Sequence, residues 1–169
     1  ILMSSLDSTL DTQVADKFRK TRKSIFVVAS CGGHLVQALD LYEAYEGLEV
    51  IYVINDRTDL DHKMLGRTII ITHAERGPKQ LINFMEAIIL VCRYKPGVVL
   101  STGASPAVPF SIVSKFISRS CIIFVESMSR VTSPSVTARL MYYIADHFYI
   151  QWEALKDFFP KARFVGRLL

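Results

Sequence analysis

The sequence predicts a single α/β domain in which a mainly parallel sheet carries helices on both faces, the doubly wound arrangement. Strand-like segments alternate with helical patterns from residue 24 onward, which favours right-handed crossovers between parallel strands. The strand-like segments are continuous runs of valine, isoleucine and phenylalanine, as is typical of strands buried on both faces. The 169 residues, half of them hydrophobic, are enough for one such core and too few for two.

The expected elements follow from these patterns in order. Strands are expected at 25–30, 50–55, 68–72, 98–102, 121–126, 148–151 and 163–165. Helix faces are traced by Leu35, Leu39, Tyr42 and Tyr45, and by Leu81, Phe84, Ile88 and Val91. Two further helices are expected at 106–118 and 134–145.

The N-terminal segment, residues 1–23, is set apart from the domain at 24–169. Its apolar residues follow the three- and four-residue steps of an amphipathic helix, and a basic run at 17–23 comes after them. Acidic residues on the same helix count against a membrane-surface helix, so docking on the domain or on a partner is favoured.

Composition argues against several classes of protein. The formal charge of +4 is modest and the aromatic residues form no RNA-binding motif, so no nucleic-acid partner is expected. The three cysteines, Cys31, Cys92 and Cys121, are too far apart to suggest a disulfide framework or a metal site. No stretch reaches the roughly 18 apolar residues of a transmembrane helix, so neither such a helix nor a signal peptide is expected. A cytoplasmic protein without metal or cofactor is expected.

The first candidate loop joins the first strand to the first helix and contains Gly32, Gly33 and His34. Two glycines let the backbone approach a ligand, and the free N–H groups of a helix start favour an anion. His34 on the first turn could take a proton from a hydroxyl or polarise an oxygen. A plain glycine turn with a half-buried histidine is the alternative.

The second candidate loop follows the fourth strand and contains Thr102, Gly103, Ser105 and Pro106. Ser105 is expected to cap the next helix, with Pro106 in its first turn. Beside the first loop, this helix start would offer a second anion-binding terminus, although capping alone also explains the pattern.

The third candidate loop follows the fifth strand and contains Glu126 and Arg130. A carboxylate that leaves a buried strand at the ligand edge is a candidate general base or hydroxyl anchor. Arg130 could bind a phosphate bidentately. A structural ion pair between Glu126 and Arg130 is the alternative.

These motifs, taken in order, resemble a known family. They are Gly32-Gly33-His34, Thr102-Gly103, Glu126-Ser127, Arg130, Tyr143-Ile144-Ala145-Asp146, Gln151-Trp152 and Val165-Gly166. The family comprises the anchoring subunit of the dolichol-pathway UDP-N-acetylglucosamine transferase and its bacterial exopolysaccharide counterparts of the PssD/CpsF type. More distantly, the chain is similar to the acceptor half of MurG-type transferases.

The resemblance implies a Rossmann-like domain that is the N-terminal half of a GT-B glycosyltransferase. It implies a heterodimer with a donor-binding subunit, which holds most of the UDP-sugar, and a lipid-pyrophosphate-sugar acceptor at the cytoplasmic membrane surface. Carried over, the Gly32-Gly33-His34 turn would face the acceptor's diphosphate and reacting hydroxyl, and Glu126 would stand near the acceptor sugar. Thr102 and Gly103 would form the neighbouring wall. The partner is expected at the strand carboxyl ends, near Gln151, Trp152 and residues 165–169.

Two other functions remain open at this point. The chain could be a non-catalytic adaptor or enhancer of a complete glycosyltransferase. It could also be a dinucleotide-binding oxidoreductase domain, because Asp56 follows the second strand at the distance from Gly33 expected of a ribose-binding acid. The turn is Cys-Gly-Gly-His rather than Gly-x-Gly-x-x-Gly, however. The eukaryotic subunit carries an N-terminal membrane helix, whereas this chain shows only an amphipathic stripe, which favours peripheral membrane contact.

Overall fold

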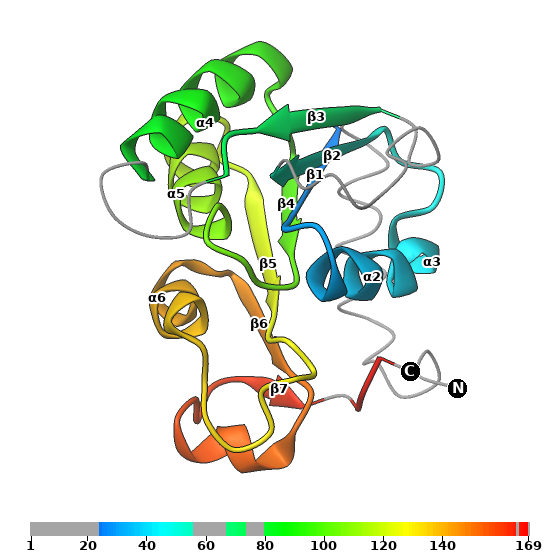
Figure 1. The fold of residues 1–169 in the computed structure, drawn as a ribbon, viewed down its shortest axis with the longest axis vertical. Helices are drawn as coiled ribbons and strands as arrows, with labels where there is room; N and C mark the ends of the chain where they lie inside the picture. The colour runs from blue at the N-terminus through cyan, green and yellow to red at the C-terminus, as the bar shows by residue number, and fades with distance from the viewer. Residues whose placement is uncertain (1–23, 56–66, 74–79, 165, 169) are drawn as a thin grey trace.

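Seven parallel strands form the framework of the molecule (Figure 1). The computed structural model describes residues 24–55, 67–73, 80–164 and 166–168. The sheet order is β3-β2-β1-β4-β5-β6-β7, and every pairing between neighbouring strands is parallel. The strands are β1 (Ile25–Ala29), β2 (Val50–Asn55), β3 (Thr68–Ile71), β4 (Val98–Ser101), β5 (Cys121–Val125), β6 (His147–Ile150) and β7 (Arg163–Phe164).

Helices cover both faces of the sheet, so the doubly wound, Rossmann-like prediction is confirmed. Helices α2 (Gly33–Asp40) and α3 (Tyr42–Tyr45) lie on one side, and α4 (Gln80–Tyr94), α5 (Ala107–Ile117) and α6 (Val136–Ile144) lie on the other (Figure 1). A short 3-10 helix, η3 (Glu153–Asp157), precedes β7. No helix in the described part of the chain is long and apolar enough to cross a membrane.

Two hydrophobic cores explain the continuous apolar runs in the sequence. Successive side chains of a strand point to opposite faces, so Phe26 and Val28 of β1 join the core beneath α4, α5 and α6. Val27 and Ala29 join the core beneath α2 and α3. Because both faces are covered, all five residues of β1 are buried.

Helix α4 turns only part of the face that its spacing predicted towards the core. Of the expected inward residues, Val91 is buried and Phe84 packs against the core, but Leu81 and Ile88 are 71% and 40% exposed. The buried residues of the helix are Asn83, Ala87 and Val91, which lie one turn apart. The small Ala87 lets α4 approach the core closely. Leu81 and Ile88 therefore remain on the outside of the helix.

Some predictions fall on residues outside the described part of the chain. The N-terminal segment 1–23 is one, and Asp56 is another. Val165 and Leu169 at the expected partner contact are also outside it, whereas the residues between them are described.

Candidate functional site

The strand order places the first two candidate loops beside each other. β1 pairs with β2 on one side and with β4 on the other. The strands β2 and β3 therefore follow β1 in one direction across the sheet, and β4 to β7 follow in the opposite direction. The chain leaves β1 towards α2 on one face and leaves β4 towards α5 on the opposite face. In open parallel sheets a ligand crevice forms at such a switch point, beyond the strand carboxyl ends.

His34 and Thr102 hold each other across this switch point. The imidazole Nδ1 lies 2.9 Å from the Thr102 carbonyl oxygen, and the Thr102 hydroxyl donates to the His34 carbonyl at 2.6 Å. A carbonyl only accepts, so Nδ1 carries the proton of this hydrogen bond. In the neutral imidazole, Nε2 is then the unprotonated nitrogen and can accept a proton. The half-buried ring is therefore held in the tautomer that suits a base.

Gly103 shapes the wall against which the imidazole packs. Its φ is +121°, and a Cβ at this position would lie 2.5 Å from His34 Cε1 and 2.7 Å from Nδ1. Any larger residue would therefore collide with the ring and adopt a strained backbone. The Ser101 hydroxyl donates to the Gly103 carbonyl at 2.8 Å and fixes this turn.

Gly32 and Gly33 leave the start of α2 open. Gly32 is the N-cap with φ +99°, and the first helical hydrogen bond runs from Val36 N–H to the Gly32 carbonyl at 3.1 Å. The N–H groups before Val36 therefore have no acceptor within the helix. Both glycines are exposed, and a Cβ on either would meet nothing within 4 Å. This geometry suits an anion that approaches the backbone closely.

Glu126 lies at the end of β5, but its carboxylate is fully buried and occupied. One oxygen accepts from Ser127 N–H at 2.9 Å, and the other accepts from Ser135 N–H at 3.1 Å and from the Ser135 hydroxyl at 3.0 Å. The Ser135 hydroxyl in turn accepts from Ala138 N–H and caps α6. Glu126 thus closes the β5–α6 loop, a structural role that differs from the expected presentation of its carboxylate to a ligand.

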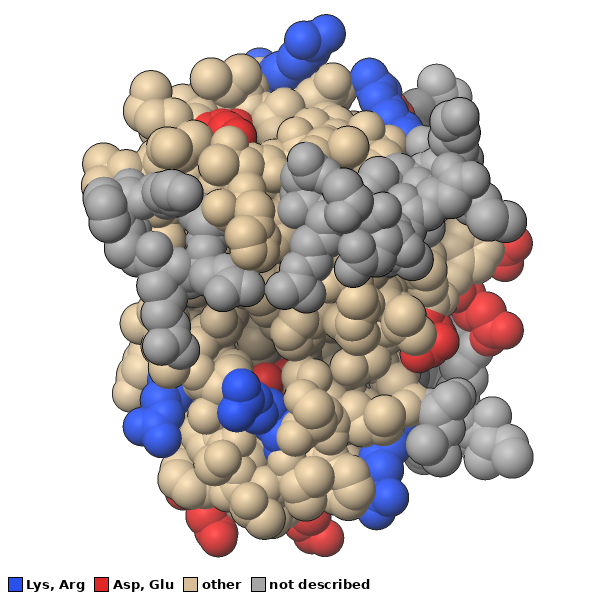
Figure 2. Space-filling view, viewed as in Figure 1, with Lys and Arg blue, Asp and Glu red and all other residues tan. Residues whose placement is uncertain are grey.

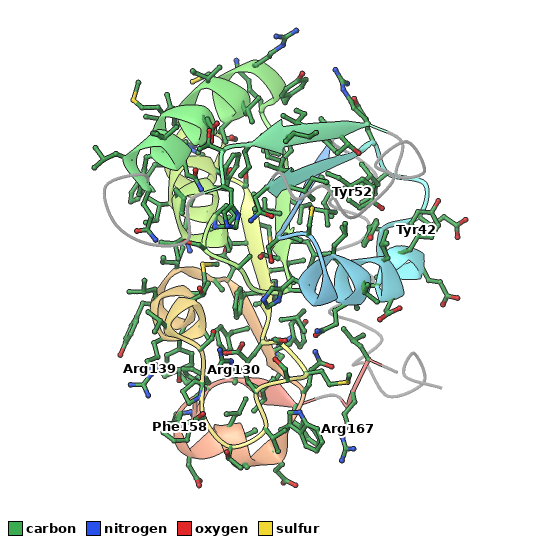
Figure 3. The ribbon with its side chains drawn as sticks, viewed as in Figure 1. Tyr42, Tyr52, Arg130, Arg139, Phe158 and Arg167 are labelled. Atoms are coloured by element: carbon green, nitrogen blue, oxygen red, sulfur yellow. The ribbon has the colours of Figure 1, made fainter. Side chains whose placement is uncertain are left out.

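Two other predicted site residues sit differently from expectation. Arg130 is exposed on the β5–α6 loop (Figure 3), and the partners of Glu126 described above do not include it. Ser105 is not the N-cap of α5, because that helix begins at Ala107 and its N-cap, Pro106, makes no side-chain capping bond. The Ser105 hydroxyl instead accepts from Gln80 Nε2 at 2.9 Å and ties the β4–α5 loop to α4.

Cys31 has a structural position in the first loop. Its backbone N–H donates to Asn55 Oδ1 at 2.9 Å, and its thiol donates to the Asn55 carbonyl at 3.0 Å. These bonds join the ends of β1 and β2. The part of the chain that the structure describes contains no group of three metal-ligating side chains.

Sequence reasoning gave no role to Gln37 and named Gln151 only in the Gln151-Trp152 motif and as a partner contact, yet both are buried between the candidate loops. Gln37 lies on the inward face of α2 beside Leu35 and Ala38, and Gln151 follows the apolar strand β6. A glutamine at an inward position of an otherwise apolar pattern is the signal that could have identified them, because buried amides need hydrogen-bond partners.

Comparison with protein families gives a match over most of the described chain. The profile of a family described as "Oligosaccharide biosynthesis protein Alg14 like" matches residues 67–168. The human protein named "UDP-N-acetylglucosamine transferase subunit ALG14" is 26% identical over 86% of this chain and 83% of its own length. The rat protein of the same name is 33% identical over 47% of this chain and 39% of its own length.

Solved structures share the fold at low sequence identity. UDP-GlcNAc 2-epimerase from Methanocaldococcus jannaschii has a TM-score of 0.62 at 12% identity over 79% of this chain. MurG from Acinetobacter baumannii has a TM-score of 0.62 at 15% identity over 78% of this chain. This chain spans 41% and 42% of those two chains, so the likeness is to one Rossmann-like domain of a GT-B protein.

Proposed function

Because the chain belongs to the family of Alg14-like oligosaccharide biosynthesis proteins, we propose that it is the acceptor-side subunit of a two-component glycosyltransferase. The complex transfers a sugar from a UDP-sugar to a lipid-pyrophosphate-linked saccharide. The observation that carries the proposal is the His34 turn, in which an open helix start and an oriented imidazole lie together at the switch point.

The turn offers one group for each part of such an acceptor. The N–H groups at the start of α2 bind the diphosphate, because the positive end of a helix favours an anion. His34 Nε2 takes the proton of the reacting hydroxyl as its oxygen bonds to the anomeric carbon of the donor sugar. The bond from that carbon to the β-phosphate oxygen breaks, and UDP leaves. A general base of this kind contributes about 10²–10⁴-fold to the rate.

Thr102 and Gly103 hold the imidazole, and Ser105 and Arg130 are the outer acceptor contacts of this proposal. Arg130 is exposed on the loop after β5, and a guanidinium is suited to bidentate binding of a phosphate. The role proposed for Glu126 is to fix this loop, because its carboxylate oxygens already accept three hydrogen bonds.

The donor-binding half is proposed to be a separate chain that docks beside the C-terminal segment. Leu168 N–H donates to Gln151 Oε1 at 2.9 Å, and the Arg167 guanidinium stacks on the Trp152 ring at 3.9 Å (Figure 3). These contacts bring residues 166–168 to the carboxyl edge of the sheet, beside the candidate site. A stable interface there is expected to bury more than about 1,000 Å².

Helix α4 is proposed to rest on the membrane that holds the acceptor lipid. Its outward side chains Leu81, Met85 and Ile89 are exposed, and the surface over α4 in Figure 2 is almost free of charge. The stripe begins beside the site, because Gln80 bonds Ser105 in the β4–α5 loop. A lipid acceptor could then extend from the turn to the membrane along this helix.

Reconstitution tests the transferase proposal. The purified chain is mixed with its partner, a lipid-pyrophosphate-linked sugar and labelled UDP-N-acetylglucosamine, the donor for which the relatives are named. We expect no transfer by the chain alone and transfer by the complex. His34→Ala should lower turnover at least about tenfold with partner binding intact. His147→Gln is the matched control, because His147 is the first residue of β6 and lies at the amino ends of the strands, opposite to the candidate site.

Three other results would each have a distinct meaning. Robust transfer by the chain alone would exclude the split enzyme. Full activity of the His34→Ala complex would make the chain an adaptor whose partner performs the chemistry. Equal losses in the His34 and His147 variants would indicate a general effect on the fold.

Co-sedimentation with vesicles that contain anionic lipids tests the membrane contact separately. Ile89→Glu should reduce the bound fraction at least about fivefold, since it removes one large apolar side chain from the contact and adds a charge. Val136→Glu is the matched control, because Val136 is exposed on α6 instead. Equal binding of the two variants would contradict membrane contact through α4.

A further inference from the structure

Two buried glutamine side chains join the loops of the candidate site. Gln37 lies on α2, three residues after His34, and Gln151 lies directly after β6. We propose that Gln37 is a positioning residue for the reaction, which holds the His34 turn in register with the β5–α6 loop. The inference rests on the proposed function, which it extends to a residue that the motifs did not include.

The amide of Gln37 uses its full hydrogen-bonding capacity. Its Nε2 donates to the Gly33 carbonyl and to the Ser127 hydroxyl, both at 3.3 Å. Its Oε1 accepts from Met128 N–H at 3.0 Å and from Gln151 Nε2 at 2.9 Å. One side chain therefore contacts the glycine turn, the loop after β5 and the end of β6 at once.

Gln151 extends the same network to the C-terminal segment. Its Nε2 donates to Gln37 and to the Glu126 carbonyl at 3.0 Å, so its Oε1 faces the opposite way. That oxygen accepts from Leu168 N–H at 2.9 Å. The Trp152 indole N–H donates to the Met128 carbonyl at 2.7 Å and fixes the same loop from the other side.

This chemistry requires an amide at position 37. An amide supplies two donors and two acceptor lone pairs, whereas a carboxylate lacks the donors and an apolar side chain lacks both. Each buried donor or acceptor without a hydrogen-bond partner raises the free energy of the folded chain. The most stable arrangement of the loops is therefore the one in which all of these hydrogen bonds are made. Because the Gly33 carbonyl precedes His34 by one residue, a shift of this turn moves the imidazole. A displacement of about 1 Å at a reacting group can cost about 10²-fold in rate.

The experiment compares Gln37→Met with Tyr45→Phe. Methionine has a similar length and none of the amide's hydrogen bonds. Tyr45→Phe removes another buried hydrogen bond to α2, from the Tyr45 hydroxyl to the Ala38 carbonyl at 2.7 Å, at a place that does not touch the loops. Gln37→Met should lower kcat of the reconstituted complex at least about tenfold and leave the donor KM within about twofold. Tyr45→Phe should leave both constants within about twofold.

A double variant tests whether Gln37 acts through His34. If it does, Gln37→Met added to His34→Ala should cause no further loss of kcat beyond about twofold. A full tenfold additional loss, or an unchanged kcat in Gln37→Met alone, would overturn the inference.

Hydrogen exchange on the isolated chain separates this inference from the proposed function. The Met128 N–H should exchange at least about tenfold faster in Gln37→Met and at the original rate in Tyr45→Phe. Unchanged exchange at Met128 would overturn the inference even if the complex is an active transferase. Faster exchange together with an inactive wild-type complex would contradict the proposed function and leave the loop contact established.

Discussion

Glu126→Gln is the substitution that best separates a structural carboxylate from a catalytic one. The change keeps the size of the side chain but replaces one oxygen by an NH2 group. In the wild type, the two carboxylate oxygens of Glu126 accept from Ser127 N–H, Ser135 N–H and the Ser135 hydroxyl. Whichever way the new amide turns, its NH2 group faces at least one backbone N–H.

The expected cost follows from these contacts. A buried donor left without an acceptor costs about 1–3 kcal/mol, and hydrogen bonds to a charged group contribute more than neutral ones. We therefore expect Glu126→Gln to lower the free energy of unfolding by about 2–4 kcal/mol. Urea denaturation of the isolated chain measures this change without any assumption about function.

Glu86→Gln is the matched control for this measurement. Glu86 also accepts from a backbone N–H and a hydroxyl, both of Thr72, but these bonds lie at the exposed surface. Water can replace the lost acceptor there, so we expect a change below about 1 kcal/mol. A Glu126→Gln variant as stable as the wild type, but inactive in the complex, would refute the structural role and restore Glu126 as a base.

Three further changes test other parts of the structure. Gly103→Ala should destabilise the fold more than Gly47→Ala in urea denaturation and should lower turnover, because both have positive φ but only the Gly103 Cβ would collide with His34. Burial raises the pKa of Tyr45 above its ordinary value of 10, so its hydroxyl stays protonated in the folded chain at a pH where the unfolded chain releases the proton. The stability that Tyr45 contributes is therefore complete below about pH 10 and is lost progressively above it. Above about pH 10, the unfolding free energy of the wild type should approach that of Tyr45→Phe. Deletion of residues 165–169 should weaken co-purification with the partner, whereas unaffected assembly would place the interface elsewhere.

The sheet could be predicted from the sequence because its central strands, β1, β2 and β4, are buried on both faces. All seven expected strands are present, and their bounds differ by about one residue from the structure. The adjacency of the His34 and Thr102 loops follows from the pairing of β1 with β4. Once the fold is known, these loops have no other place to lie.

The sequence could not reveal which polar side chains are hydrogen-bonded within the fold and which remain available to a ligand. Glu126 at the end of an apolar strand fits a ligand-facing carboxylate as well as a loop anchor, and only its distance to Ser135 decides between them. The predicted inward face of α4 was wrong in part, for a related reason. Leu81 and Ile88 fit a helical stripe by spacing, but contact with the core depends on how closely Ala87 lets the helix approach.

The exposure of the His34 turn gives a physical reason for a partner. A base and an anion-binding helix start are most effective where water is excluded, because the local dielectric constant is then low. In this chain Gly32 and Gly33 are exposed, and a Cβ on either would meet nothing within 4 Å. The groups that would perform the transfer are thus held from one side, by Thr102 and Gly103, and open on the other. A second domain that carries the donor sugar would cover the open side and exclude water at the moment of transfer, which is why activity is expected to depend on the complex.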